Sequence, residues 1–137
     1  MARSFLNVVT VDGKLCRLAE FGFDADLPSF DKNRVIFRQD GKFKCIDLAD
    51  GRITPAEPPS FEKTRTSPNG KHTVTLEFAT ELTEGKGYVH LMLRNNENGT
   101  QTVLTRFMGC AESVGERPFS DDSKSIVFFG YPENELG

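Results

Sequence analysis

The fold is decided by Ser67-Pro68-Asn69-Gly70-Lys71-His72-Thr73-Val74, a tight turn that leads directly into a strand-like segment. Pro, Asn and Gly in succession favour turn conformations, whereas Thr and Val favour extended structure. The same arrangement occurs at 28–37 and at 118–128, where an apolar run again follows a short polar segment. A turn-and-strand element that recurs along one chain predicts a repeat protein.

A second element also recurs. Gly13-Lys14-Leu15-Cys16-Arg17-Leu18-Ala19-Glu20-Phe21 aligns without a gap with Gly99-Thr100-Gln101-Thr102-Val103-Leu104-Thr105-Arg106-Phe107, and Gly, Leu and Phe coincide. Gly51-Arg52-Ile53-Thr54 is a shorter version between these two copies. The two recurring elements therefore alternate along the chain.

Turn residues separate the expected strands. Asp-Gly and Asn-Gly pairs favour type I′ hairpin turns, which need positive φ at both central positions. Such pairs occur at Asp12-Gly13, Asp40-Gly41, Asp50-Gly51 and Asn98-Gly99. Segments rich in β-branched and aromatic residues lie around them, at Leu6–Val11, Arg34–Arg38, Lys42–Leu48, Thr73–Phe78, Gly87–Arg94, Val103–Thr105 and Ser125–Phe129. The sequence predicts an all-β chain.

Two features refine this prediction. Val35-Ile36-Phe37 and Ile126-Val127-Phe128-Phe129 are continuous apolar runs, which are typical of strands covered on both faces. The segment 76–82 places Phe78 and Leu82 four residues apart, as in a helix, but it is short and has no capping residue. We therefore expect a strand followed by a loop there.

The combination of elements resembles the blade repeat of TolB-type β-propellers. The turn at Ser67–Lys71, the apolar strand after it, a hairpin and the closing segment Gly99–Thr105 match the order of that repeat. The resemblance implies β-propeller blades, which are four-stranded antiparallel units. The copies are diverged, and an ordinary β-sandwich with Asp-Gly turns is the alternative.

The resemblance divides the single domain 1–137 into about three units. An outer half-blade at 1–22 and an inner half-blade at 110–137 make one unit split between the chain ends, and the full blades are 23–57 and 58–109. Three blades do not readily close a ring, because propellers use four to eight or so. Two arrangements stay open: a piece of a longer propeller, or a homodimer that completes a six-bladed ring.

Composition limits the partners. The 137 residues carry a net charge of −3, which gives no attraction to nucleic acid or anionic membranes. The cysteine count of three is odd, which favours reduced thiols over a disulfide framework. The apolar run near Met1 is too short and polar for a signal peptide. We expect a cytoplasmic protein, or a periplasmic one if a signal has been removed.

The sequence contains no strong catalytic or metal motif. His72 and His90 stand alone, without the spacing of a metal site, so we expect no metal and no cofactor. Asp24, Asp26 and Asp31 lack the pattern of a calcium loop, and we expect them to accept backbone hydrogen bonds in turns.

The longest blade insertion, 77–87, is the expected partner-binding region. It contains Glu77, Glu81, Glu84 and Lys86, which form a mainly acidic stretch suited to a basic partner, although a merely solvated face would look the same. The function that we expect is a non-enzymatic binding or protein-interaction scaffold for a protein or peptide. The alternative is a propeller-type lyase or hydrolase acting on oligosaccharides or peptides, for which the sequence assigns no catalytic residue.

Overall fold

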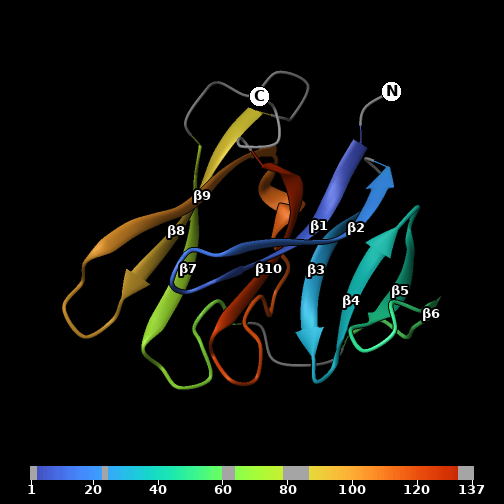
Figure 1. Cartoon of the computed structure of the whole chain (residues 1–137), viewed down its shortest axis with the longest axis horizontal. Coiled ribbons are helices and arrows are strands. Elements are labelled where there is room, and N and C mark those ends of the chain that lie inside the picture. The colour runs from blue at the N-terminus through green and yellow to red at the C-terminus, as the bar shows by residue number, and fades with distance from the viewer. Residues whose placement is uncertain (1–2, 23–24, 60–63, 79–86, 133–137) are drawn as a thin grey trace.

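The computed structural model describes residues 3–22, 25–59, 64–78 and 87–132. Within these residues the chain is all-β, with one short 3-10 helix, η1 (Ala111–Ser113), and no α-helix that could cross a membrane. All pairs of strands are antiparallel (Figure 1). The strands are β1 (Arg3–Thr10), β2 (Leu15–Gly22), β3 (Ala25–Asp31), β4 (Arg34–Gln39), β5 (Lys42–Asp47), β6 (Ile53–Pro55), β7 (His72–Phe78), β8 (Gly87–Asn95), β9 (Gln101–Gly109) and β10 (Ser125–Pro132).

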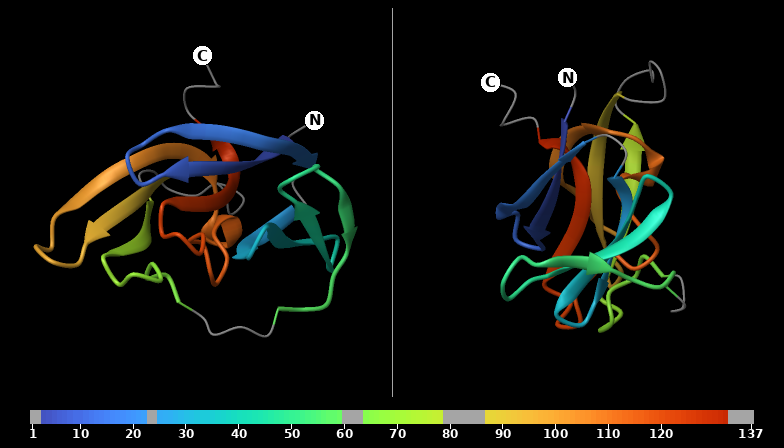
Figure 2. Two further views of the ribbon diagram at one scale, coloured as in Figure 1. Left: turned by 60° about the horizontal axis from the view of Figure 1, so that its bottom comes forward. Right: turned by 90° about the vertical axis from the view of Figure 1, so that its right-hand side faces the viewer.

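The sheets form an arch. One hydrogen-bonded series has the order β2-β1-β10-β9-β8-β7, and a separate sheet has the order β3-β4-β5-β6. β10 and β9 share only two residue pairs, Tyr131–Met108 and Pro132–Phe107. The β7–β9 strands therefore separate from β10 along most of their length. Figure 2 shows the β7–β9 strands and the β3–β6 sheet at the two ends of the arch, with β10, β1 and β2 between them.

β10 is the centre of the core, as its apolar run predicts. Ile126 and Phe128 are fully buried against the β7–β9 strands, whereas Val127 and Phe129 are buried against the β3–β6 sheet. Successive side chains of a strand point to opposite faces, so a strand covered on both sides must be apolar at every position. Val35-Ile36-Phe37 in β4 is also at most 4% exposed, which confirms the second predicted run.

Strands from the two ends of the chain lie side by side. β1 pairs with β10 over six positions, from Phe5–Gly130 to Thr10–Ser125. This ladder forms within one chain, so it gives no support to a second copy completing this unit. The homodimer stays a prediction.

The recurring turns are built in the same way. In one turn Ser67 Oγ donates to Asn69 Oδ1, which also accepts the amide of Lys71, and the amide of His72 donates to Ser67 Oγ. In the other, Ser120, Asp122, Lys124 and Ser125 make the same three bonds. The predicted correspondence between 66–74 and 118–128 therefore holds at the level of individual hydrogen bonds.

The type I′ prediction is correct for one hairpin only. Asp40 and Gly41 have φ of 53° and 76°, as this turn requires. At the other three pairs only the glycine has positive φ, and the residue before it keeps negative φ. Instead, Asp50 and Asn98 accept the main-chain amides of Arg52 and Thr100, and Asp12 accepts from the Thr10 hydroxyl.

All of the predicted strands are present, and β2, β3 and β6 lie outside the predicted set. β3 is irregular. Its register with β4 shifts between Asp26 and Ser29, and Leu27 between them has a φ of 52°. A β-bulge at this position hides the alternation that a sequence would otherwise show. The segment 76–82 is a strand up to Phe78, and its remainder lies outside the described residues.

Candidate functional site

The β3–β6 sheet has one face in the core and one face outside it. Val35, Phe37 and Ile46 point into the core beside Val127 and Phe129 of β10. The side chains that alternate with these along each strand point to the opposite face, and so do their partners in register on the neighbouring strands. We call this the outer face, and it contains Ser29, Asp31, Arg34, Ile36, Cys45, Asp47 and Thr54.

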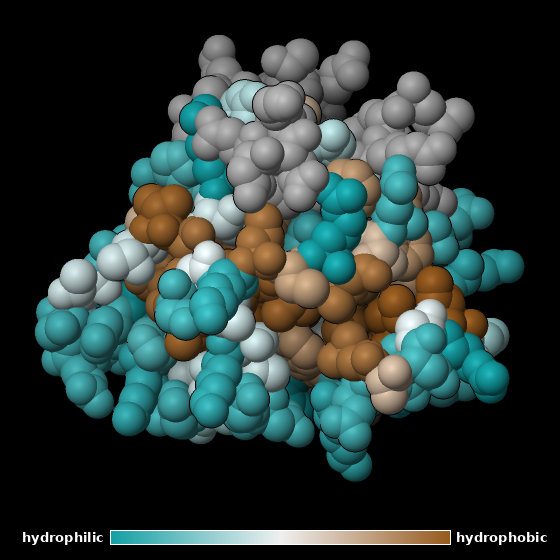
Figure 3. Space-filling view, in the orientation of Figure 1, coloured by the Kyte–Doolittle hydropathy of each residue, from teal (hydrophilic) through white to brown (hydrophobic). Residues whose placement is uncertain are grey.

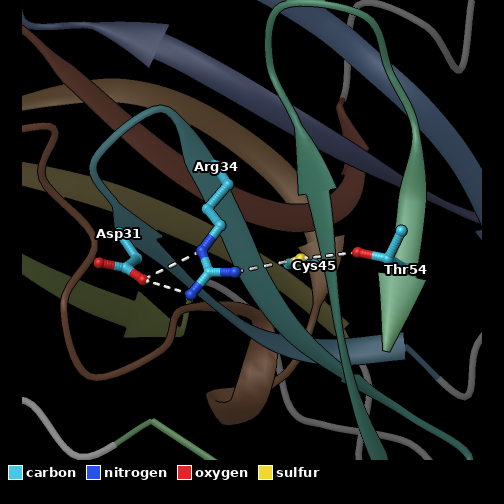
Figure 4. Close-up of polar contacts among 4 residues, drawn as sticks. All are labelled: Asp31, Arg34, Cys45 and Thr54. Carbon is cyan, nitrogen blue, oxygen red and sulfur yellow. Dashed lines mark hydrogen bonds and ion pairs between the residues drawn. The ribbon is translucent and has the colours of Figure 1, made fainter. Parts of the chain in front are cut away.

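Four of these side chains make a continuous row of polar contacts (Figure 4). Arg34 donates from Nε and Nη2 to one oxygen of Asp31, at 3.1 and 2.9 Å. Its Nη1 donates to Cys45 Sγ at 3.6 Å, and Cys45 Sγ lies 3.2 Å from Thr54 Oγ1. The row thus crosses β3, β4, β5 and β6 and fixes the guanidinium plane. The hydrogen bonds that Arg34 donates to Asp31 also raise the pKa of Arg34, which keeps it charged.

A second arginine pair lies on the same sheet. Arg38 donates to both carboxylate oxygens of Asp26, at 2.9 and 2.8 Å. The expectation that Asp26 and Asp31 accept backbone hydrogen bonds was therefore wrong, because each lies opposite an arginine in the β3–β4 ladder. Asp24 lies outside the described residues.

A cavity of about 560 Å³ opens on the outer face. Asp31, Arg34 and Ile36 form the side that belongs to the sheet. The segment 55–59, rich in proline, forms a second side and contributes Glu57. Arg117 forms a third. The cavity thus combines a small apolar surface with two guanidinium groups and two carboxylates.

Arg117 reaches the cavity because its segment follows the edge of β3. Gly115 N–H donates to Pro28 O, Arg117 N–H donates to Ser29 Oγ, and Arg117 O accepts from Phe30 N–H, all within 2.9–3.1 Å. A Cβ atom on Gly115 would lie 2.4 Å from Pro28 O, so only glycine allows this approach. Beyond this edge, Arg117 forms an ion pair with Asp121 at 3.6 Å.

This geometry suits recognition of a polar chain. Guanidinium groups held in a fixed plane donate to carboxylate and carbonyl oxygens, and the carboxylates accept from amide or ammonium groups. Cavities of 300–1,000 Å³ with a few fixed polar groups are typical of ligand sites. Among the described residues, no group of three or more His, Cys, Asp and Glu side chains is arranged to hold a metal ion.

Two further cavities differ in character. One of about 480 Å³ lies between β1–β2 and the β3–β4 turn, and Val8, Leu18, Phe30 and Leu48 line its apolar part. Apolar side chains also gather across the middle of the face drawn in Figure 3. The other is only about 70 Å³ and contains Cys110. Burial raises the pKa of the Cys110 thiol, which disfavours a reactive thiolate.

The predicted partner-binding residues do not lie at the 560 Å³ cavity. Glu77 is exposed on β7, where it lies opposite His90 in the ladder with β8. Glu81, Glu84 and Lys86 lie outside the described residues, so the prediction of a partner site at 77–87 stays untested. His90 in turn lies opposite Arg106 of β9, and neither His72 nor His90 lines any of these three cavities.

Sequence reasoning missed Asp31, Arg34 and Arg117 as a group. Arg34 and Arg38 lie at the two ends of the apolar run Val35–Phe37. This pattern indicates a buried strand with polar ends, but it does not indicate a binding site. Nothing in the sequence indicates that Arg117 approaches β3, because the contact joins residues far apart in the chain.

No protein-family model and no curated protein matches the chain. Among solved structures, it is similar to one described as "The structure of putative TolB from Agrobacterium tumefaciens". The match covers 94% of this chain and 98% of that chain, with a TM-score of 0.64 and 9% sequence identity. At this identity the likeness shows the fold alone, which is a TolB-like arrangement of antiparallel sheets. The number of repeats and the unit boundaries stay predictions.

Proposed function

We propose that the protein is a binding scaffold and that the outer face of the β3–β6 sheet, with its 560 Å³ cavity, is where a protein or peptide binds. The observation that carries this proposal is the fixed guanidinium of Arg34, held by Asp31 and Cys45 at the wall of an open cavity. A side chain that is already immobilised loses little entropy when a partner binds, so its hydrogen bonds contribute more affinity.

The chemistry of the cavity favours an extended polypeptide segment. Main-chain carbonyl and amide groups can pair with the guanidinium and carboxylate groups, and one apolar side chain can contact Ile36 and the prolines of 55–59. Arginine is also enriched among the residues that dominate binding energy at protein interfaces. The TolB-like fold is compatible with such a role but is not by itself an argument for it.

The enzymatic alternative, a lyase or hydrolase, has no specific observation in its favour. A histidine beside carboxylates in a cavity would favour it. His90 has Glu77 opposite it, but the pair lies on a sheet face outside the three cavities.

A peptide selection tests the proposal. A random peptide display library is selected against the 137-residue chain, and the binders are measured by calorimetry against the wild type, Arg34→Ala and Arg52→Ala. Arg52 is an exposed arginine of the β5–β6 turn that does not line the cavity, and it serves as the matched control.

We expect Arg34→Ala to weaken the selected peptides about tenfold or more and Arg52→Ala to leave them unchanged. Thermal unfolding of both variants checks that the fold is retained. The proposal is contradicted if both variants bind the selected peptides as the wild type does, or if the selection yields no binder.

A further inference from the structure

The 480 Å³ cavity is separate from the proposed binding face. It shares no lining residue with the 560 Å³ cavity, and its volume is typical of a ligand site. Its apolar part comes from β1, β2, β3 and the segment after β5, and consists of Val8, Leu18, Phe30 and Leu48. Leu48 is 40% exposed and Phe30 is 4% exposed, so this apolar surface extends from the solvent inward. It can hold an apolar group of a ligand.

Lys32 brings a positive charge to the same cavity. It lies with Asn33 in the two-residue turn between Asp31 and Arg34, which pair in register and through an ion pair. Within the described ranges, neither the Lys32 side chain nor the Asn33 side chain has a hydrogen-bond or ion-pair partner. Lys32 also has a φ of 57°, where glycine would be less strained. An unfavourable backbone conformation that is kept beside a cavity points to a binding role.

The turn before β10 brings negative charge to another side of the cavity. Ser120 Oγ and the Lys124 amide donate to Asp122 Oδ1 at 2.6 and 3.0 Å, which holds the carboxylate in place and lowers its pKa. Among the described residues, nothing donates to the second oxygen, Oδ2. The neighbouring Asp121 already forms an ion pair with Arg117. Asp122 is therefore the carboxylate that is more available to a ligand.

The two charges line one cavity without pairing with each other. No ion pair joins Lys32 to Asp122 in the part of the chain that the structure describes, so a gap separates the ammonium from the carboxylate. A ligand with opposite charges at its two ends can bridge this gap. A simple anion would meet Asp122 as a like charge, and a simple cation would meet Lys32 in the same way.

We infer that the 480 Å³ cavity binds a short peptide with free ends, whose carboxylate contacts Lys32 and Asn33 and whose ammonium group contacts Asp122. An apolar side chain of the peptide lies against Leu18, Phe30 and the other apolar lining residues. The two charged ends of a peptide are further apart than those of a free amino acid, as suits charges too distant to pair with each other. The inference goes beyond the proposed function, because it concerns a different cavity.

A dipeptide and its blocked forms test the ligand class. Calorimetry measures the binding of phenylalanyl-leucine, of its N-acetyl form, of its C-terminal amide and of free phenylalanine to the 137-residue chain. We expect saturable binding of the free dipeptide and binding about fivefold to tenfold weaker for each of the other three. The inference is overturned if the dipeptide does not bind, or if a blocked form or free phenylalanine binds as tightly.

Substitutions of the two charged residues test the site. Lys32→Gln is expected to bind the free dipeptide and its amide equally, because the charge that recognises the carboxylate is gone. Asp122→Asn keeps an acceptor for its two hydrogen bonds and is expected to bind the free dipeptide and its N-acetyl form equally. Lys42→Gln is the matched control, because Lys42 is exposed and lines neither of the two larger cavities. Thermal unfolding checks that each variant is folded.

Arg34→Ala distinguishes this cavity from the proposed binding face. We expect it to leave the affinity for phenylalanyl-leucine unchanged, since Arg34 lines only the other of these two cavities. Dipeptide binding that is lost in Arg34→Ala and kept in Lys32→Gln would overturn the inference. The peptides selected for the proposed function are measured separately, so each proposal can fail without the other.

Discussion

The main-chain N–H of Asn69 donates a hydrogen bond to Ser123 Oγ over 3.0 Å. The bond joins two turns of the same construction, one before β7 and one before β10. Ser123 is 5% exposed and has a φ of 64°, in the place where the first turn has Gly70 at 74°. The second turn thus keeps a strained non-glycine residue whose side chain ties the two copies together.

Replacing Ser123 separates these two effects. Ser123→Ala removes the acceptor for the Asn69 amide and keeps the strained φ, so we expect a loss of about 1–2 kcal/mol in the free energy of unfolding. Ser123→Gly also removes the acceptor but relieves the backbone strain, so its loss should be smaller. Urea unfolding measures both. A glycine variant as unstable as the alanine variant would contradict this account.

Asp122 is expected to accept one substitution and not another. Asn69 makes the same contacts in the first turn with an amide oxygen, so Asp122→Asn should be nearly neutral. Asp122→Ala leaves the Lys124 amide and the Ser120 hydroxyl without their acceptor, and should cost about 1 kcal/mol. Thermal unfolding compares the two variants, and equal losses would refute the equivalence of the turns.

The Asp122 carboxylate also makes the stability of the folded protein depend on pH. Hydrogen bonds from Ser120 and Lys124 lower the pKa of Asp122 below its ordinary value of 3.8. A depressed pKa in the folded state contributes stability that is present above pH 3.8 and is lost as the pH falls through the folded value. The Asp122→Asn variant should lack this part of the acid sensitivity. Unfolding curves of both proteins between neutral pH and pH 3 measure the difference, and parallel curves would rule it out.

Gly115 should tolerate no side chain. An alanine Cβ would lie 2.4 Å from Pro28 O and 2.6 Å from Ser29 Oγ, so Gly115→Ala must push its segment off β3. We expect a loss of about 2 kcal/mol or more, with displacement of Arg117 from the cavity. Gly41→Ala is the comparison, because its φ of 76° is strained but a Cβ there has open space, and about 1 kcal/mol is expected. Denaturant unfolding measures both stability losses, and a loss for Gly115→Ala no larger than that for Gly41→Ala would contradict the prediction.

The three cysteines should react at different rates. Cys16 is exposed, Cys45 is 5% exposed, and burial raises the pKa of Cys110. Because the thiolate is the reactive form, iodoacetamide at neutral pH should modify Cys16 first and Cys45 last. Peptide mapping by mass spectrometry gives the order. Labelling of Cys45 in the folded protein as fast as Cys16 would show that the β5 environment is more open than described.

The sequence was sufficient to predict the elements that are determined by their own residues. The run Ile126–Phe129 is apolar at every position because β10 has core on both sides, and Ser67-Pro68-Asn69-Gly70 forms its turn with its own side chains. In both cases the determining contacts are either local or uniform along the strand. Hence the all-β class, most strands and the correspondence of the turns could be predicted.

The cavity could not be predicted, because its parts meet only through tertiary contacts. β3 contains a bulge at Leu27 that disrupts its alternation, and Arg117 lies beside it only through main-chain bonds to residues 28–30. Acidic residues, by contrast, are conspicuous in sequence wherever they occur. This is why the stretch at 77–87 attracted the prediction of a partner site.

The outer face of the β3–β6 sheet is the proposed binding face. Hydrogen–deuterium exchange of the chain, alone and saturated with a selected peptide, locates the binding face. We expect the added protection on β4, β5 and residues 53–59. Protection confined to β1 and β2, with β4 and β5 unchanged, would contradict it.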